Sequence, residues 1–420
     1  MNRFLLATLL LCACGDDDDR DPLVDAGDAP DAAIDMAAPE EDGGPPPLDC
    51  ATLALDETFV VAPGFSDANI HPSATFTGDA VWATVTVVEP GTSVFDVMLV
   101  RLSCDGRQSD PILVSSTPAL SDLDADVALG SEGLLVSWQA DAGSGTIETW
   151  VRLHDDETGT ALGEPRKLET TREGEPVEGT VWSPLLVEND GAFDLVGERG
   201  IEAASAFQAY VQPLDATGAS AGATIEPFFE AMVGQNGAVG LRTSEGLTLA
   251  WTREPAEGEP SVVTVSPGGE PVTVPAGGLQ ASGPSLAAFG DQRWVAYSTG
   301  AGTRRIEAFP IGGDTATPFG RSGNTDIGPQ LVAGDSALGL AWLRTTAGFR
   351  ADLFVRRVDV EGTVPTAGDE VEIPTTGDVF APYAIDMVHI RDDVFFLTWI
   401  QGETRDGETR YEMAGRFVQL

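Results

Sequence analysis

Three aspartates, Asp122, Asp124 and Asp126, alternate along one short stretch and are the sequence's most suggestive group of oxygen ligands. Alternating acids are typical of calcium loops, but the glycine and the closing glutamate of such a loop are missing here. Calcium therefore stays an open candidate at this stretch, and no other cofactor is indicated. The pair Asp124 and Asp126 would also suit glycoside hydrolysis, which uses two carboxyl groups at a defined separation.

The other residue types capable of chemistry lack partners at a useful spacing. Residues 218–222, GASAG, match the pattern of a nucleophile elbow, but that turn needs a helix after its strand and a histidine partner. We expect Ser220 to lie in a strand hairpin instead. The three histidines, His71, His154 and His389, are too scattered for a metal site or an acid-base pair.

A repeat that runs through most of the chain must position these residues. Residues 283–297, GPSLAAFGDQRWVAY, are nearly restated by residues 328–342, GPQLVAGDSALGLAW. In both stretches the last aromatic residue follows a proline by thirteen positions. The same spacing, or a degenerate form of it, marks seven units that end at Val85, Trp138, Gly197, Trp251, Tyr297, Trp342 and Trp399.

Each unit contains four short predicted strands separated by turn residues. A strand follows the anchor residue, a polar turn leads to the strand with the aromatic residue, and a third strand ends in a hairpin signal such as LSCDG. Blades of four antiparallel strands cannot bury their faces alone, so they pack side by side. We predict an all-β, seven-bladed β-propeller over residues 51–420. Its recurring tryptophans and tyrosine are then packing residues of the blades and not a sugar platform.

The two ends of the repeat complement each other. The seventh unit stops at its third strand, RYEMAGRFVQL, and a stray strand at 55–63, LDETFVVAP, precedes the first unit. If this strand fills the vacant fourth place, both exposed edges disappear and the ring is closed. We therefore expect the N-terminal strand to pair with the C-terminal one.

Any functional site is expected at one face of this ring. The loops that lead into the blades, among them 121–126, and the loops between second and third strands lie together there. Trp182 is the one large aromatic residue expected near this rim. The loops are acidic and rich in glycine, which suits protein contacts or cations better than anionic substrates.

The N-terminus carries signals of export and anchoring. Residues 1–13 combine one arginine with a short apolar run, which is typical of a signal peptide. The sequence that follows, Leu11-Cys12-Ala13-Cys14-Gly15, resembles the bacterial lipobox, and this resemblance implies cleavage before Cys14 and lipid attachment to it. Residues 14–50 are rich in Asp, Ala and Pro, and we predict a disordered tether between lipid and propeller.

The net charge restricts the classes of binding partner, and the cysteine count predicts a disulfide. A formal net charge of −44 opposes binding to nucleic acid, so we expect none, and contact with the membrane is expected only through the lipid. Once Cys12 is removed and Cys14 is lipidated, Cys50 and Cys104 remain as an even pair in an oxidising compartment. They lie in adjacent blades on one face of the predicted ring, so we predict a disulfide between them.

As a whole, the chain resembles bacterial lipoproteins with seven-bladed propellers, which are loosely similar to TolB-like and WD40-like repeats. The Trp-Asp ending, the Gly-His start and the Asp-box of such families are absent, so the resemblance implies architecture and not activity. We predict a monomeric, non-enzymatic lipoprotein of the cell envelope, anchored in the outer membrane, that binds or scaffolds envelope or extracellular proteins. The alternative is a carbohydrate-active hydrolase or lyase that binds glycans and uses rim carboxylates.

Overall fold

The computed structural model describes most of the repeat region, within one compact unit that spans residues 47–420. The predicted signal peptide, Cys14, the tether and Cys50 lie outside the described residues. The described residues are 53–65, 71–88, 94–115, 121–141, 147–169, 171–172, 175–176, 181–201, 206–228, 233–320, 323–345, 350–380, 385–405 and 408–420.

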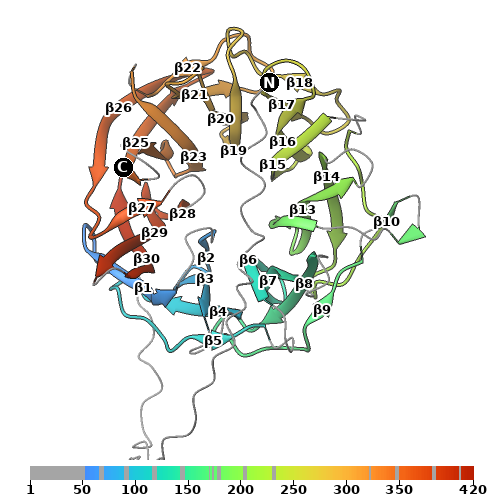
Figure 1. The fold of residues 1–420 in the computed structure, drawn as a ribbon, viewed down its shortest axis with the longest axis vertical. Helices are drawn as coiled ribbons and strands as arrows, with labels where there is room; N and C mark the ends of the chain where they lie inside the picture. The colour runs from blue at the N-terminus through green and yellow to red at the C-terminus, as the bar shows by residue number, and fades with distance from the viewer. Residues whose placement is uncertain are drawn as a thin grey trace, which may run out of the picture. The chain divides into compact units, whose positions relative to one another are not determined.

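The described residues form seven antiparallel blades, which confirms the predicted fold (Figure 1). Blade 1 contains β2 (Ser73–Phe76), β3 (Val81–Val88), β4 (Phe95–Leu102) and β5 (Ile112–Leu113). Blade 2 contains β6 (Ser121–Gly130), β7 (Gly133–Asp141), β8 (Ile147–His154) and β9 (Arg166–Lys167). Blade 3 contains β12 (Val181–Asn189), β13 (Ala192–Ile201) and β14 (Ala206–Leu214), and its fourth strand is reduced to a bridge between Val211 and Ile225.

The later blades repeat this order. Blade 4 contains β15 (Val233–Thr243), β16 (Gly246–Pro255), β17 (Ser261–Val265) and β18 (Val272–Thr273). Blade 5 contains β19 (Ala281–Phe289), β20 (Gln292–Thr299), β21 (Arg305–Pro310) and β22 (Thr317–Pro318). Blade 6 contains β23 (Thr325–Ala333), β24 (Leu338–Thr345), β25 (Arg350–Glu361) and β26 (Val364–Ile373). Blade 7 contains β28 (Ile385–Arg391), β29 (Val394–Arg405), β30 (Glu408–Gln419) and β1 (Thr58–Phe65).

Two short additions join neighbouring blades. The hairpin of β10 (Thr171–Arg172) and β11 (Glu175–Pro176) lies between blades 2 and 3 in the sequence. Strand β27 (Asp378–Phe380) pairs with both β25 and β29, so it links blade 6 to blade 7. Among the described residues there is no helix, and hence none that is long and apolar enough to cross a membrane.

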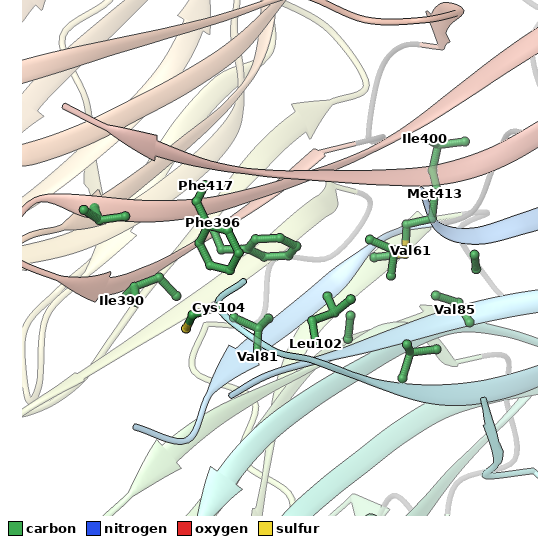
Figure 2. Packing of buried hydrophobic residues seen from close by; sticks show 14 residues of the cluster. Val61, Val81, Val85, Leu102, Cys104, Ile390, Phe396, Ile400, Met413 and Phe417 are labelled. Carbon is green, nitrogen blue, oxygen red and sulfur yellow. The ribbon is translucent and has the colours of Figure 1, made fainter. Parts of the chain in front are cut away.

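The N-terminal strand closes the ring, as predicted. Strand β1 pairs antiparallel with β30, with Thr58 opposite Arg416 and Val60 opposite Ala414. Its observed bounds begin and end slightly later than the predicted 55–63. Figure 2 shows how Phe396 and Phe417 of blade 7 face the apolar side chains of blade 1, with Val61 of β1 in the same cluster. The first strands of all seven blades also contact one another in a closed order, from β2 round to β28 and back.

The recurring aromatic residues pack inside the blades, as predicted. Trp138, Trp251, Tyr297, Trp342 and Trp399 are all buried, and each lies within the second strand of its blade and not at its end. Blade 3 has a glycine at this place.

The glycine of blade 3 is explained by its neighbour on the next strand. Gly197 of β13 pairs with Tyr210 of β14, and Tyr210 is 1% exposed. A Cβ on Gly197 would lie 2.9 Å from the tyrosine ring. The ring of Tyr210 thus occupies the space that the tryptophan takes in other blades.

Candidate functional site

The three sequence-predicted aspartates lie on strand β6 and not in a loop before it. A β-bulge interrupts β6 between Leu123 and Asp126, which pair with Gln139 and Ser137. Asp122 pairs with Ala140. Paired residues share a face of a sheet and successive residues alternate, so Ala140 and Ser137, three positions apart, lie on opposite faces. The bulge therefore places Asp122 and Asp126 on opposite faces of blade 2.

Asp122 and Asp124 both have structural roles. Asp122 is fully buried, and the indole N–H of Trp138 donates to its Oδ1 over 3.2 Å. Asp124 is the first residue of the bulge and has a φ of 47°, in the left-handed region. Gly237, Gly283 and Gly328 take the same place in the bulges of β15, β19 and β23, with φ between 59° and 64°. Aspartate tolerates this conformation better than most residues, which explains its place here.

Asp126 belongs to a position that recurs in every blade, the first residue after the bulge place of the innermost strand. We call it the inner-ring position. In each blade the residue at this position pairs with the second-strand residue directly before the one that ends the repeat unit. The seven members are Ser73, Asp126, Leu185, Val239, Ser285, Gln330 and Asp386.

The polar members of the inner-ring position bind the following blade. The Asp126 carboxylate accepts a hydrogen bond from the backbone N–H of Leu186 in blade 3, with 2.5 Å between Oδ2 and N. Asp386 Oδ2 accepts one from the N–H of Ala74 in blade 1 at 2.9 Å. In both cases the donor is the residue directly after the inner-ring position of the next blade.

The two serines of this position act in the same way. Ser73 Oγ accepts from the N–H of Val127 at 3.3 Å, and Ser285 Oγ accepts from the N–H of Leu331 at 2.9 Å. Ser73 also donates its hydroxyl proton to Asp126. The three blades 7, 1 and 2 are thus joined by a continuous series of polar contacts from Asp386 through the backbone beside Ser73 to Asp126.

The carboxyls at this position titrate abnormally. Loss of hydration raises the pKa of Asp126 to about 6, although the N–H of Leu186 and the hydroxyl of Ser73 oppose the shift. Loss of hydration also raises the pKa of Asp386 to about 7, and repulsion from Asp126 adds to this shift. Burial therefore favours the protonated form of both carboxyls.

Glu198 on β13 is a third carboxylate that holds a neighbouring blade. Its Oε1 accepts from the backbone N–H groups of Gly237 and Ala238, the bulge of blade 4. Desolvation raises the pKa of Glu198 to about 7, with a smaller contribution from the charge of Glu254. Trp182, the predicted rim aromatic, lies on β12 with its backbone opposite Glu198.

Metal-binding and nucleophilic patterns do not assemble among the described residues. No group of three His, Cys, Asp or Glu side chains in that part of the chain is arranged to hold a metal ion. His154 is fully buried and its Nδ1 lies 2.8 Å from the carbonyl oxygen of Gly159, while His389 lies beside Asp335. Ser220 lies in the hairpin after β14, bridged to Leu214, as predicted.

Cys104 lies just after β4 and is fully buried between blades 1 and 7. The N–H of Ala54 donates to the carbonyl oxygen of Cys104 at 2.9 Å. The described chain therefore comes close to Cys104 only four residues after Cys50, and the disulfide between the two cysteines remains a prediction.

The sequence singled out Asp126 as a candidate calcium ligand or catalytic carboxylate, not as an acceptor for blade 3, and it did not single out Asp386 or Glu198. In blade 7 the spacing from Pro382 to Trp399 is four residues longer than in other blades, so Asp386 did not align with Asp126. Alignment on the tryptophan in place of the proline would have found it. Nothing in the sequence near Glu198 indicates that it binds the bulge of the next blade.

Comparisons with known proteins identify the fold and no family. No protein-family model matches the chain, and no curated protein matches it in sequence. A structure of a protein of unknown function from Dyadobacter fermentans is 12% identical, with a TM-score of 0.50 over 72% of this chain and 99% of that one. The α-L-arabinanase of Penicillium chrysogenum, solved with arabinobiose, is 12% identical, with a TM-score of 0.49 over 85% of this chain and 97% of that one. Likeness at this identity shows the propeller fold alone.

Proposed function

We propose that this protein is a lipid-anchored lipoprotein of the bacterial cell envelope whose propeller binds a protein partner and catalyses no reaction. The observation that carries the non-enzymatic part is the use of the inner-ring carboxylates. Asp126 and Asp386 each accept a backbone N–H of the next blade, so they serve the closure of the ring. A propeller presents a rigid surface to a partner, and this one uses its buried carboxylates between its own blades.

The sequence supports the location. The lipobox-like stretch that ends at Cys14 and the acidic tether that follows would hold a monomeric ring away from the outer membrane. The strong negative charge of the chain favours partners with basic surfaces and opposes nucleic acid.

The test is crosslinking of the anchored protein in intact cells, followed by pull-down and mass spectrometry. We expect one discrete protein in near-stoichiometric amount. The matched control is Cys14→Ser, which removes the site of lipid attachment and leaves the propeller unchanged, and we expect it to lose most of that partner. Recovery of lipid and glycan without any such protein from wild-type cells would contradict the proposal.

A second candidate, a glycan-cleaving enzyme, is favoured by the electrostatics of one pair. Asp386 has a pKa of about 7 and responds to the charge of Asp126, whose pKa is about 6. Glycoside hydrolysis needs a pair of carboxyls, one as the proton donor and one as the base or nucleophile, and burial here favours a protonated carboxyl that could donate.

Assays on a panel of polysaccharides and aryl glycosides decide between the two functions. The enzyme predicts turnover that is lost in Asp386→Asn and in Asp126→Asn and retained in Asp124→Gly. The last variant is the control, because glycine occupies that bulge place in three other blades. The binding function predicts no turnover by the wild-type protein on any substrate of the panel.

A further inference from the structure

The outer strand of blade 6 is much longer than those of blades 1, 2, 4 and 5, and longer than the eight-residue β1 of blade 7. In blades 1, 2, 4 and 5 the fourth strand is two residues long, whereas β26 has ten residues. Strand β26 pairs with β25 along one side, and no described strand pairs with its other side. Figure 1 shows β26 as a long strand on the outside of the ring. An edge of this length exposes a row of unpaired backbone N–H and C=O groups.

The local sequence explains why β26 is long. A two-residue turn, Gly362 and Thr363, joins it to β25, with Gly362 at a φ of 64° and Glu361 paired directly with Val364. Such tight hairpins keep both strands in register from their first pair. The other four blades named above have longer loops between third and fourth strands, and their fourth strands pair over only two residues.

Both faces of this edge carry exposed acids, and one of them also carries exposed valines. Val364 and Val371 are 63% and 48% exposed, and their partners Glu361 and Val355 lie on the same face of β25. Glu372 is exposed and lies on the opposite face, since it directly follows Val371. Asp369, in the bulge opposite Arg357, adds a second exposed acid. Arg357 is two residues from Val355 on β25, so Asp369 lies on the same face as Val371. The edge is therefore mixed aliphatic and acidic on one face, and it carries the acid Glu372 on the other.

We propose that β26 is a docking edge for an extended, basic peptide segment of the protein partner, which adds to blade 6 as a further strand. Backbone hydrogen bonds along the edge would supply affinity, and the exposed acids on both faces would select cationic side chains. A second copy of the chain fits poorly, because both edges would carry the same exposed acids, Asp369 and Glu372. This inference rests on the proposed protein-binding function.

The direct test uses a ten-residue peptide of alternating valine and lysine. We expect it to bind the propeller and to slow amide hydrogen exchange within residues 364–373. The Asp369→Lys/Glu372→Lys variant should bind at least tenfold more weakly. Its control, Glu270→Lys/Asp314→Lys, makes the same change of charge at exposed acids beside the two-residue strands β18 and β22, and should bind as wild type does.

A second peptide separates strand pairing from simple charge attraction. The same sequence with every backbone amide N-methylated keeps every lysine but has no backbone N–H to donate along either edge, and we expect no binding. Equal binding of both peptides, or binding without protection of residues 364–373, would overturn the inference.

Crosslinking in intact cells distinguishes the docking edge from the protein-binding function. A partner captured in intact cells with crosslinks away from β26 contradicts the docking edge and leaves the protein-binding function in place. Pairing of the valine-lysine peptide with β26 in the absence of any cellular partner supports the edge and contradicts the proposed function.

Discussion

At the scale of single residues, different side chains at equivalent positions of the blades make the same contact with the next blade. The inner-ring position is serine in blades 1 and 5 and aspartate in blades 2 and 7, and all four accept a backbone N–H of the next blade. The bulge place just before it is aspartate in blade 2 and glycine in three other blades. The acids of β6 are thus explained by backbone geometry and by closure of the ring.

The pH dependence of stability follows from the inner-ring carboxyls. The native pKa values, about 6 for Asp126 and about 7 for Asp386, lie above the value of about 4 in an unfolded chain. Between these values the native state binds more protons, so their contribution to stability is fully present below about pH 4 and is lost as the pH rises through about 7. We predict that the free energy of unfolding falls over this range and falls less steeply in Asp126→Asn/Asp386→Asn.

Chemical denaturation at a series of pH values measures both slopes. The control is Glu132→Gln, which removes an exposed carboxylate at the turn between β6 and β7 and should keep the wild-type slope. A double variant with the wild-type slope would show that other groups govern the pH dependence.

At the scale of elements, an inner strand such as β7 is buried on both faces, whereas the outer strand β1 buries one face. Blade 3 keeps its packing because Tyr210 fills the space above Gly197. The two faces of strand β1, which closes the ring, differ in burial: Val61 is 1% exposed, whereas the adjacent Val60 is 38% exposed. The effect of a substitution in these strands therefore depends on the face it changes.

Blade 3 gives one prediction. In Gly197→Ala the new methyl group would lie 2.9 Å from the ring of Tyr210, so we expect a loss of about 1–3 kcal/mol in the free energy of unfolding. Gly222→Ala is the control, because its Cβ would meet only Pro213 at 3.8 Å, and we expect at most about 0.5 kcal/mol. Equal stability of the two variants in denaturant titration would contradict the packing described.

The closing strand β1 gives a second prediction. Val61→Ala removes buried methyl groups between blades 7 and 1, and we expect a loss of about 2 kcal/mol. The same substitution one residue earlier, Val60→Ala, should change stability by less than about 0.5 kcal/mol. Thermal and denaturant unfolding measure both, and a Val61→Ala variant as stable as Val60→Ala would argue against closure by β1.

The predicted disulfide gives a third prediction. We expect peptide mapping without reductant to recover Cys50 linked to Cys104, and Cys50→Ser to lower the stability of the oxidised protein by about 4 kcal/mol. Reduction should bring the wild-type protein down to the variant and leave the variant unchanged. Two unlinked peptides in the oxidised protein would refute the pairing.

At the scale of the whole molecule, the architecture was predictable because each blade repeats the same sequence pattern at a regular spacing. Trp251 and Trp342 must recur at one place in their blades, and the spacing between such residues predicts the blades and the closing strand. The site was only partly predictable. A bulge at Asp124 changes the face of Asp126, and a strand's alternation pattern does not contain this shift. The contact of Asp386 with Ala74 joins residues 312 positions apart, and no local pattern encodes it.

The measurement that tests the account most directly is the hydrogen exchange rate of the Ala74 amide in the wild-type protein and in Asp386→Ala. If Asp386 joins blade 7 to blade 1, its removal leaves that N–H without its acceptor and we predict exchange about tenfold faster or more. The Leu331 amide, held by Ser285, should be unchanged. An Ala74 amide equally protected in both proteins would contradict the account, because the carboxylate of Asp386 would then be available for chemistry.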